Sequence, residues 1–404
     1  MRTKGQRGPG TSRTHPRILQ VIPTVSKHYG GPAIGAIALN RALAALGADA
    51  LLLSTSYTDG SGARLSREEQ DDLAEQGINV VLSAPSRPFS LENSVGLLKR
   101  TLRHARSADL IHINGQYMLP CVYAYLAARI WRTPYGLQVH GTLEPYQRRV
   151  SATKKKIYNT LIGTSIINRA TYVHFASLSE AQRASDVVRP DQVIVRPLGA
   201  ELPDAVAPTA DGLVKQIERV PRNARFLYLG RFATKKRPGL LLRAWASSNA
   251  SKSGVLIMAG PDGAITSIEL KCLAEELGIT SSVVFVGSVD GPEKSWLYRN
   301  AGTFILPSEN ENFAITIGEA MLAGCHVITT PEVAASSFLV TAGAGDVIDG
   351  MDESSLSNAL DTALDDPVRS AQSGRIAKAF ASENMTWKPL ATYLLSTAKE
   401  EMLS

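Results

Sequence analysis

Cysteine and long apolar runs are both scarce in this sequence. Its 404 residues include only three cysteines, Cys121, Cys272 and Cys325, which lie far apart and form no C-x-x-C spacing. This pattern argues against a disulfide framework or a zinc site and favours buried, inert thiols. Because no apolar run approaches the roughly 18 residues that cross a bilayer, we expect no membrane-spanning helix.

The beginning of the chain also lacks an apolar stretch. Residues 1–17 hold five Lys/Arg and no acid, among Gly, Pro, Ser and Thr. A secretory signal peptide needs an apolar segment after its charges, and the next hydrophobic run covers only residues 18–22. We therefore expect residues 1–16 to be a disordered basic tail and the protein to be cytoplasmic.

Acidic residues are fewer than basic ones, which leaves a formal net charge of +6. No helix-turn-helix, RNA-recognition or zinc-finger pattern accompanies this charge, so we expect no nucleic-acid partner. Phosphate-bearing small molecules and anionic lipid headgroups account for the charge equally well.

The sequence does contain a repeated cycle in which short apolar runs alternate with longer amphipathic stretches. Buried parallel strands are typical of continuous apolar runs, and the helices between them cover both faces of a sheet. The pattern predicts a doubly wound α/β domain over residues 17–200, with strands at residues 17–23, 50–53, 80–82, 110–113, 137–139 and 172–175.

The cycle breaks over residues 201–223, where three prolines and Gly212 interrupt a polar stretch. It resumes with strand-like runs at residues 225–229, 255–258, 283–286, 304–306 and 327–329. We predict a second doubly wound domain over residues 224–385, joined to the first by a linker, and a helix at residues 386–404 that packs back on the first domain. Two such domains would face a central cleft, where ligands bind beyond the carboxyl ends of the strands.

Basic residues follow the first strand of the second domain. Gly230 and Arg231 come directly after the strand, and residues 235–237 are Lys-Lys-Arg. Gly230 would let a phosphate approach the backbone, while Arg and Lys side chains pair with phosphate oxygens. The alternative is a solvated basic turn, since such clusters are common on protein surfaces.

Two glutamates, Glu311 and Glu319, follow the strand at residues 304–306. If residues 311–319 were all helical, the eight-residue offset would be about 12 Å along the helix axis. That exceeds the roughly 5–9.5 Å between the carboxyl groups of a glycosidase. The pair therefore favours one long ligand, such as a sugar joined through diphosphate to ribose, over a hydrolytic acid–base pair. The alternative is two solvated surface acids.

These segments together resemble the family 4 retaining glycosyltransferases of GT-B fold, the bacterial polysaccharide-type group 1 enzymes. The motifs that carry the resemblance are Gly230-Arg231 with Lys236, the E-x(7)-E pair Glu311 and Glu319, Tyr29-Gly-Gly-Pro32, Val139-His-Gly141 and Pro197-Leu-Gly199. The resemblance implies that Arg231 and Lys236 hold the diphosphate of a UDP- or GDP-linked sugar and that Glu319 binds the ribose hydroxyls.

The resemblance also assigns the groups around the donor sugar. Glu311 would contact the sugar, helped by backbone N–H groups from Asn312, Phe313 and Ala314. His140 would face the sugar from the first domain, and Gly30 and Gly31 would form a loop that closes over donor and acceptor. Two positions depart from the family pattern, which usually has glycine where Ala314 stands and often where Arg237 stands.

Two of the seven histidines, His140 and His112, are expected to have different roles. His140 follows a predicted strand and precedes Gly141, so we expect it at the ligand site. His112 lies inside a strand-like run, so we expect it to be a bonded core histidine.

A second basic cluster, Arg148, Arg149, Lys154, Lys155 and Lys156, precedes the amphipathic residues 157–167. A solvated face is one explanation. The other is peripheral contact with anionic lipid on the inner face of the membrane.

The sequence thus predicts a retaining hexosyltransferase that moves a sugar from a nucleoside diphosphate to a glycan or lipid-linked acceptor, with no cofactor and no metal. The alternative from another class is a catalytically silent GT-B partner subunit. A nicotinamide oxidoreductase is disfavoured, because Gly30-Gly31-Pro32 stands where a G-x-G-x-x-G loop would be.

Overall fold

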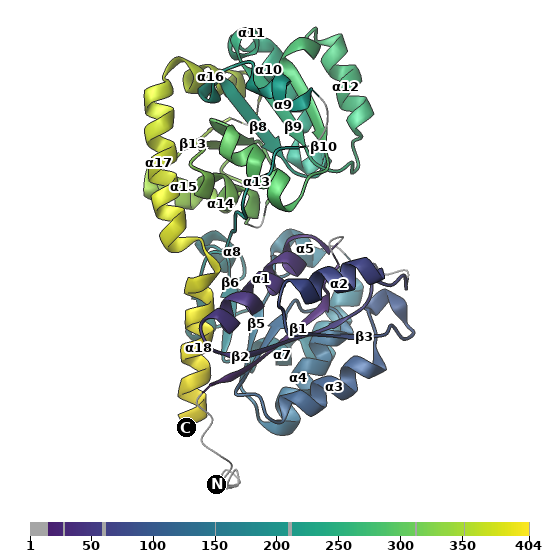
Figure 1. Cartoon of the computed structure of the whole chain (residues 1–404). Helices are drawn as coiled ribbons and strands as arrows, with labels where there is room; N and C mark the ends of the chain where they lie inside the picture. Colours follow the sequence, from purple (N-terminus) through teal and green to yellow (C-terminus); the bar gives the residue numbers. More distant parts are fainter. Residues whose placement is uncertain are drawn as a thin grey trace. The chain divides into compact units, whose positions relative to one another are not determined.

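A computed structural model describes residues 15–26, 29–58, 62–149, 151–208, 212–311, 313–350 and 352–403. The predicted basic tail therefore lies almost entirely outside the described residues. The chain forms two compact units (Figure 1). The N-terminal unit comprises Met1–His174, Ala184–Ile194 and Leu390–Ser404, and the C-terminal unit comprises Phe175–Arg183 and Val195–Pro389.

The N-terminal unit is built on a seven-stranded sheet of order β3-β2-β1-β4-β5-β6-β7. Its strands are β1 (Arg17–Thr24), β2 (Asp49–Thr55), β3 (Val80–Ser83), β4 (Leu110–Asn114), β5 (Tyr135–Gln138), β6 (Tyr172–Phe175) and β7 (Val193–Val195). The pairings from β3 through β6 are all parallel. The strand order reverses between β1 and β4, as in a doubly wound sheet.

Helices cover both faces of this sheet, with α1 and α2 on one side and α3 and α4 on the other (Figure 1). The helices of this unit are α1 (Gly31–Ala45), α2 (Arg67–Glu75), α3 (Val95–Ala105), α4 (Leu119–Trp131), α5 (Pro145–Arg149), α6 (Ala152–Tyr158), α7 (Thr164–Asn168) and most of the C-terminal α18 (Trp387–Leu403). Helix α8 (Leu178–Arg183) lies in the segment that belongs to the C-terminal unit. Short helical turns span Phe89–Leu91, Asn159–Gly163 and Pro190–Gln192. Tyr393 of α18 packs edge-on against Tyr172 of β6, at 5.4 Å between ring centroids.

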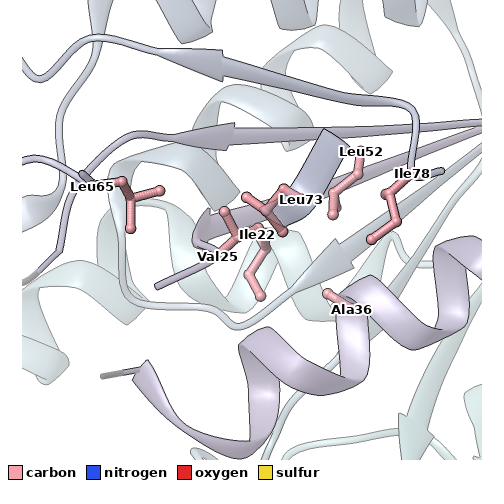
Figure 2. Packing of buried hydrophobic residues seen from close by; sticks show 7 residues of the cluster. All are labelled: Ile22, Val25, Ala36, Leu52, Leu65, Leu73 and Ile78. Carbon is pink, nitrogen blue, oxygen red and sulfur yellow. The ribbon is translucent and has the colours of Figure 1, made fainter. Parts of the chain in front are cut away.

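The core beneath α1 and α2 explains why these elements form. Figure 2 shows side chains from β1, β2, α1 and α2 meeting in one buried cluster that includes Ile22, Leu52 and Leu73. Burying an aliphatic side chain of this size contributes about 1.5–3 kcal/mol. The start of α2 is fixed separately by a capping box between Ser66 and Glu69.

The C-terminal unit repeats the plan with a six-stranded sheet of order β10-β9-β8-β11-β12-β13. Its strands are β8 (Arg225–Leu229), β9 (Val255–Ala259), β10 (Val283–Gly287), β11 (Thr303–Leu306), β12 (His326–Thr329) and β13 (Asp346–Val347), all in parallel pairings. Its helices are α9 (Leu213–Glu218), α10 (Pro238–Ser247), α11 (Ala250–Ser253), α12 (Ser267–Glu276), α13 (Gly291–Asn300), α14 (Ile315–Ala323), α15 (Ser336–Ala342), α16 (Glu353–Asp365) and α17 (Pro367–Asn384), with short turns at Arg222–Ala224, Thr234–Lys236 and Thr280–Ser282.

The predicted fold class, two doubly wound α/β domains, is confirmed. Each apolar run predicted as a strand overlaps a strand of the structure. The apolar runs did not predict β7 and β13, which have only three and two residues. No helix was predicted at α9, which lies inside the segment expected to be a linker. The predicted site residues do follow strands: Gly230 follows β8 and His140 comes two residues after β5.

Candidate functional site

The C-terminal unit brings a lysine and a glutamate together beyond the ends of β8 and β11. Lys236 Nζ lies 2.8 Å from Glu311 Oε1, and the two side chains are only 15% and 13% exposed. The Ser308 hydroxyl donates to the same carboxylate oxygen at 3.4 Å. The Lys236 side chain also covers Gly230, where an added Cβ would stand 3.4 Å from Lys236 Cδ. The Lys236 side chain thus packs directly over the backbone at the end of β8.

The three consecutive basic residues have different environments. Lys235 is 55% exposed, and its ammonium lies 3.5 Å from Glu311 Oε1. Arg237 has a left-handed backbone, with φ of 51°, and turns away to pair with Glu309. Of the three, Lys236 is thus the one that lies over the end of β8. Arg237 links the loop after β8 to the loop after β11 through its pair with Glu309.

Arg231 lies at the rim of this site. It is exposed, and none of the described side chains pairs with its guanidinium group. The loop after β9 packs against its stem, because a Cβ on Gly263 would lie 3.0 Å from Arg231 Cγ. The stem is therefore held while the guanidinium stays available for an anion.

The loop from Glu311 to α14 leads into a helix start. Asn312 lies outside the described residues, so its predicted role is not addressed by the structure. Phe313 is 2% exposed, and its ring packs against Phe338 at 6.0 Å between centroids. Ala314 has a left-handed backbone, with φ of 60° and ψ of 77°. Among the described residues, the N–H groups of Phe313 and Ala314 have no acceptor, as is typical of a helix N-terminus that can bind an anion or a hydroxyl.

Glu319 occupies a second, separate position on α14. It is 5% exposed. Its Oε1 lies 2.5 Å from Lys294 Nζ, and its Oε2 accepts a hydrogen bond from the Tyr298 hydroxyl at 3.0 Å. Burial, followed by the charge of Glu319, raises the pKa of Tyr298 well above its ordinary value. Tyr298 is therefore a hydrogen-bond donor to a fixed carboxylate.

The two glutamates consequently lie in different ion pairs. Glu311 precedes α14 and forms a short parallel bridge with Val333, so residues 311–319 are not one helix and the 12 Å estimate does not describe them. The separation into two polar positions is nevertheless compatible with one extended ligand.

In the N-terminal unit, the glycine loop forms the start of α1. Gly30 has φ of 78° and ψ of −142°, a conformation open to glycine, and a Cβ there would meet nothing within 4 Å. Gly31 and Pro32 begin the helix, and Ala33 N donates to Gly30 O at 3.1 Å. The loop therefore offers an open helix N-terminus at the carboxyl edge of the sheet.

His140 also lies at this edge, with a left-handed φ of 48°. Its Nε2 is 3.3 Å from Asn114 Oδ1 at the end of β4. Burial, and then the neighbouring His174 and His112, lower its pKa to about 3. The imidazole is therefore neutral at physiological pH and acts as a hydrogen-bonding group.

The prediction for His112 is confirmed, because it is fully buried in β4. Its Nδ1 lies 2.9 Å from the Tyr172 hydroxyl and its Nε2 lies 2.9 Å from Gln138 Oε1. Burial lowers its pKa to about 4.

Ser308, Lys294 and Tyr298 were missed from the sequence. Lys294 and Tyr298 are four residues apart on α13, so they lie on one helix face. That spacing was visible in the sequence, but nothing in it indicated that this face packs against α14. Ser308 lies inside the Pro307–Glu319 segment, but nothing in the sequence distinguished it from an ordinary loop serine, so no role was predicted for it.

The basic cluster near α6 is partly internally bonded. Arg148 forms a two-pronged pair with Asp186, at 2.7 and 3.0 Å. Lys155 lies over the Tyr117 ring at 4.9 Å. Arg149, Lys154 and Lys156 are exposed. Of the helices that the structure describes, none combines the length and apolarity needed to span a membrane.

Family models match both units of the chain. Residues 30–199 match the model of the glycosyl transferase 4-like domain, and residues 213–380 match the model of glycosyl transferases group 1. A D-inositol 3-phosphate glycosyltransferase of Corynebacterium diphtheriae is 25% identical over 395 residues, which cover 91% of this chain and 89% of that protein. One from Stackebrandtia nassauensis is 28% identical over 300 residues, covering 71% and 67%.

Solved structures agree on the fold. Anabaena HepE in complex with UDP and glucose superposes with a TM-score of 0.72 and 21% identity, covering 96% of this chain and 100% of that one. WaaG, a glycosyltransferase involved in lipopolysaccharide biosynthesis, gives a TM-score of 0.63 at 16% identity, covering 93% and 99%. With one family model on each half, this chain belongs to the group 1 glycosyltransferases and has their GT-B fold of two Rossmann-like domains.

Proposed function

We propose that this glycosyltransferase is a retaining, metal-independent enzyme that moves a hexose-type sugar from a UDP- or GDP-linked donor to an acceptor hydroxyl. The observation that carries the proposal is the Lys236–Glu311 ion pair over Gly230 at the end of β8. A diphosphate needs positive charge and a close backbone, and a sugar needs a hydrogen-bond acceptor nearby. The complexes of HepE with UDP and with UDP-glucose support a nucleotide-sugar donor.

Each group would have one task. Arg231 and Lys236 would stabilise the charge that grows on the leaving diphosphate. Glu311, held by Lys236 and Ser308, would accept hydrogen bonds from the donor sugar. The N–H groups of Phe313 and Ala314, which have no acceptor among the described residues, would add donors on the same ligand.

The nucleoside end would bind at Glu319. A carboxylate has about four lone-pair positions, so Glu319 can accept ribose hydroxyls while it is bonded to Lys294 and Tyr298. His140 would donate or accept a hydrogen bond at the donor sugar as a neutral imidazole, since its pKa is about 3. Proton transfer from His140 is not required, because the departing phosphate can take the acceptor proton.

Retention and metal independence have direct tests. A front-face route leaves the α-configuration of the donor sugar in the product, which NMR of the anomeric proton reads directly. Turnover with a chelator present should equal turnover without it, because Arg231 and Lys236 supply the positive charge. An inverted product would refute retention, and loss of turnover that added Mg²⁺ restores would refute metal independence.

The donor itself can be found by calorimetric titration with a panel of UDP- and GDP-sugars. The alternative, a catalytically silent subunit of GT-B fold, need not bind any of them. Glu319→Ala and Lys236→Ala should each abolish most transfer while the protein remains folded. Near-full turnover in either variant would refute these site assignments.

We further propose that the enzyme works in bacterial surface polysaccharide or glycolipid synthesis and touches anionic membrane through α6 and the Asn159–Gly163 turn that follows it. Ile157 and Leu161 are 57% and 78% exposed and lie one turn apart, beside the exposed Lys154 and Lys156. Basic residues near an anionic surface contribute about 1 kcal/mol each. Sedimentation with phosphatidylglycerol vesicles should therefore exceed sedimentation with phosphatidylcholine vesicles.

The matched variants for this test are Ile157→Ser with Leu161→Ser, and Lys154→Gln with Lys156→Gln. Both should reduce vesicle binding, while donor binding stays unchanged. Equal binding of the wild type to neutral and anionic vesicles would refute the lipid contact.

A further inference from the structure

The carboxylate of Glu311 contacts its polar neighbours through a single oxygen. Lys236 Nζ lies 2.8 Å and Lys235 Nζ lies 3.5 Å from Oε1, and the Ser308 hydroxyl donates to the same oxygen at 3.4 Å. No hydrogen bond or ion pair joins Oε2 to any residue that the structure describes. The lysines therefore hold one oxygen of Glu311, and the other oxygen can accept a hydrogen bond from a ligand.

The backbone on both sides of this ion pair is anchored. The Lys235 carbonyl accepts a hydrogen bond from Glu309 N at 2.8 Å, which joins the loop after β8 to the loop after β11. The Glu311 carbonyl accepts one from Ala334 N at 3.1 Å. The Glu311 side chain is only 13% exposed, so it has little room to swing away. A ligand at the end of β8 therefore shares Lys236 with the Glu311 carboxylate.

The charges of this site match those of a sugar-bearing diphosphate. Three cations lie in the loop after β8, namely Arg231, Lys235 and Lys236. Glu311 cancels one of these charges, and Arg237 adds none because it is paired on the loop after β11, so a net charge of plus two remains. A diphosphate between a nucleoside and a sugar has one ionised oxygen on each phosphorus. A free nucleoside diphosphate has another ionisable oxygen on its terminal phosphate, with a pKa of about 6, and so carries roughly one more negative charge at neutral pH.

The additional charge of the free nucleotide lies where the donor carries its sugar. Transfer breaks the bond between the anomeric carbon and the terminal phosphate oxygen, and the acceptor proton that this phosphate takes up is lost to water at neutral pH. If Glu311 contacts the donor sugar, it faces neutral hydroxyls before transfer and an anionic phosphate after it. A carboxylate accepts hydrogen bonds from hydroxyls but repels a phosphate, and the repulsion is strong where little water reaches the pair.

We propose that Glu311 discriminates between the nucleoside diphosphate sugar and the free nucleoside diphosphate, and that it thereby promotes release of the nucleotide product. The hydroxyls of the donor sugar donate to Oε2 while Oε1 stays with the lysines. The product instead places an anion beside this carboxylate and competes with it for Lys236. This inference rests on the proposed transferase function and gives one residue of the same site a second role, in the step that follows transfer.

The test is calorimetric titration of wild type and Glu311→Gln with UDP, GDP and their hexose conjugates. Glutamine keeps the shape of the side chain and carries no charge. For the base that binds, we expect Glu311→Gln to bind the free nucleoside diphosphate about tenfold more tightly than wild type does. Its affinity for the sugar conjugate should be equal to that of wild type or lower. Glu311→Ala, a second neutral variant, should show the same gain for the free nucleotide.

Matched variants separate the charge of Glu311 from its shape. Glu311→Asp keeps the charge on a shorter side chain, so it should bind the free nucleotide within about twofold of wild type and lose affinity for the sugar conjugate. Glu275→Gln, at an exposed glutamate on α12, should change neither affinity, and melting curves show whether each variant is folded. Unchanged or weaker binding of the free nucleotide by the neutral variants, or an equal gain in Glu311→Asp, would overturn this inference. Failure of the wild type to bind any of these nucleotides would instead contradict the proposed function.

Discussion

Replacing Glu92 with glutamine should stabilise the protein, and the gain should depend on pH. Burial raises the pKa of Glu92 from 4.5 to about 7. A group whose pKa is raised on folding favours the folded state below its unfolded pKa, and that contribution is lost as pH rises through the folded value. Two to three pKa units correspond to roughly 3 kcal/mol, since each unit is about 1.4 kcal/mol.

The expected difference in unfolding free energy between Glu92→Gln and wild type is therefore near zero at pH 4. It should grow between about pH 4.5 and 7 and then level off at roughly 3 kcal/mol. Glutamine keeps the shape and one carbonyl oxygen but never ionises, so it isolates the charge.

Urea unfolding followed by circular dichroism and tryptophan fluorescence, at a series of pH values, measures this difference. Calorimetry resolves the two units where they unfold separately. The exposed Glu75→Gln is the control and should show no comparable trend. A difference that is constant with pH, or a glutamine variant less stable than wild type at pH 8, would refute the argument.

Three further predictions concern the C-terminal unit. Lys294→Met should leave the Glu319 carboxylate without its cation and lower the free energy of unfolding by about 2 kcal/mol. This is below the usual cost of breaking a fully buried pair, because Lys294 is 20% exposed. Urea unfolding measures the loss, and adding Glu319→Gln to the variant should recover most of it. Ala314→Gly should raise stability by about 0.5–1 kcal/mol, because alanine is strained at a φ of 60°; a lower melting temperature would contradict this. Burial raises the pKa of Asp346, but hydrogen bonds from His326 and Arg369 outweigh it and bring the pKa to about 2. That stabilisation is present above about pH 4 and is lost as pH falls through 2. Asp346→Asn should therefore cost about 2 kcal/mol at pH 7 and less than about 0.5 kcal/mol at pH 2, as acid-unfolding curves would show.

Much of the fold could be read from the sequence because buried parallel strands are apolar along their whole length. β9 and β11 are fully buried, so their runs stood out. β13 pairs through only two residues, which is too short for any periodic signal. Helix α9 was missed because Gly212 and the prolines of its neighbourhood favour a linker.

The candidate site likewise contains residues that the sequence indicated and residues that only the packing of the structure reveals. Lys236 and Glu311 follow strands and belong to a motif, so the sequence indicated both. Lys294 was invisible, because its pairing with Glu319 depends on how α13 packs against α14. Glu92 carries no motif, and the burial that raises its pKa is not visible in the sequence.

The central claim is that the C-terminal unit holds a nucleoside diphosphate sugar through Lys236. The most direct measurement is calorimetric titration of wild type and Lys236→Ala with UDP, GDP and their hexose conjugates. We predict that wild type binds one of these nucleotides with micromolar affinity and that Lys236→Ala loses most of it while its melting profile is retained. Failure of the wild type to bind any of them, or equal affinity in Lys236→Ala, would contradict the claim.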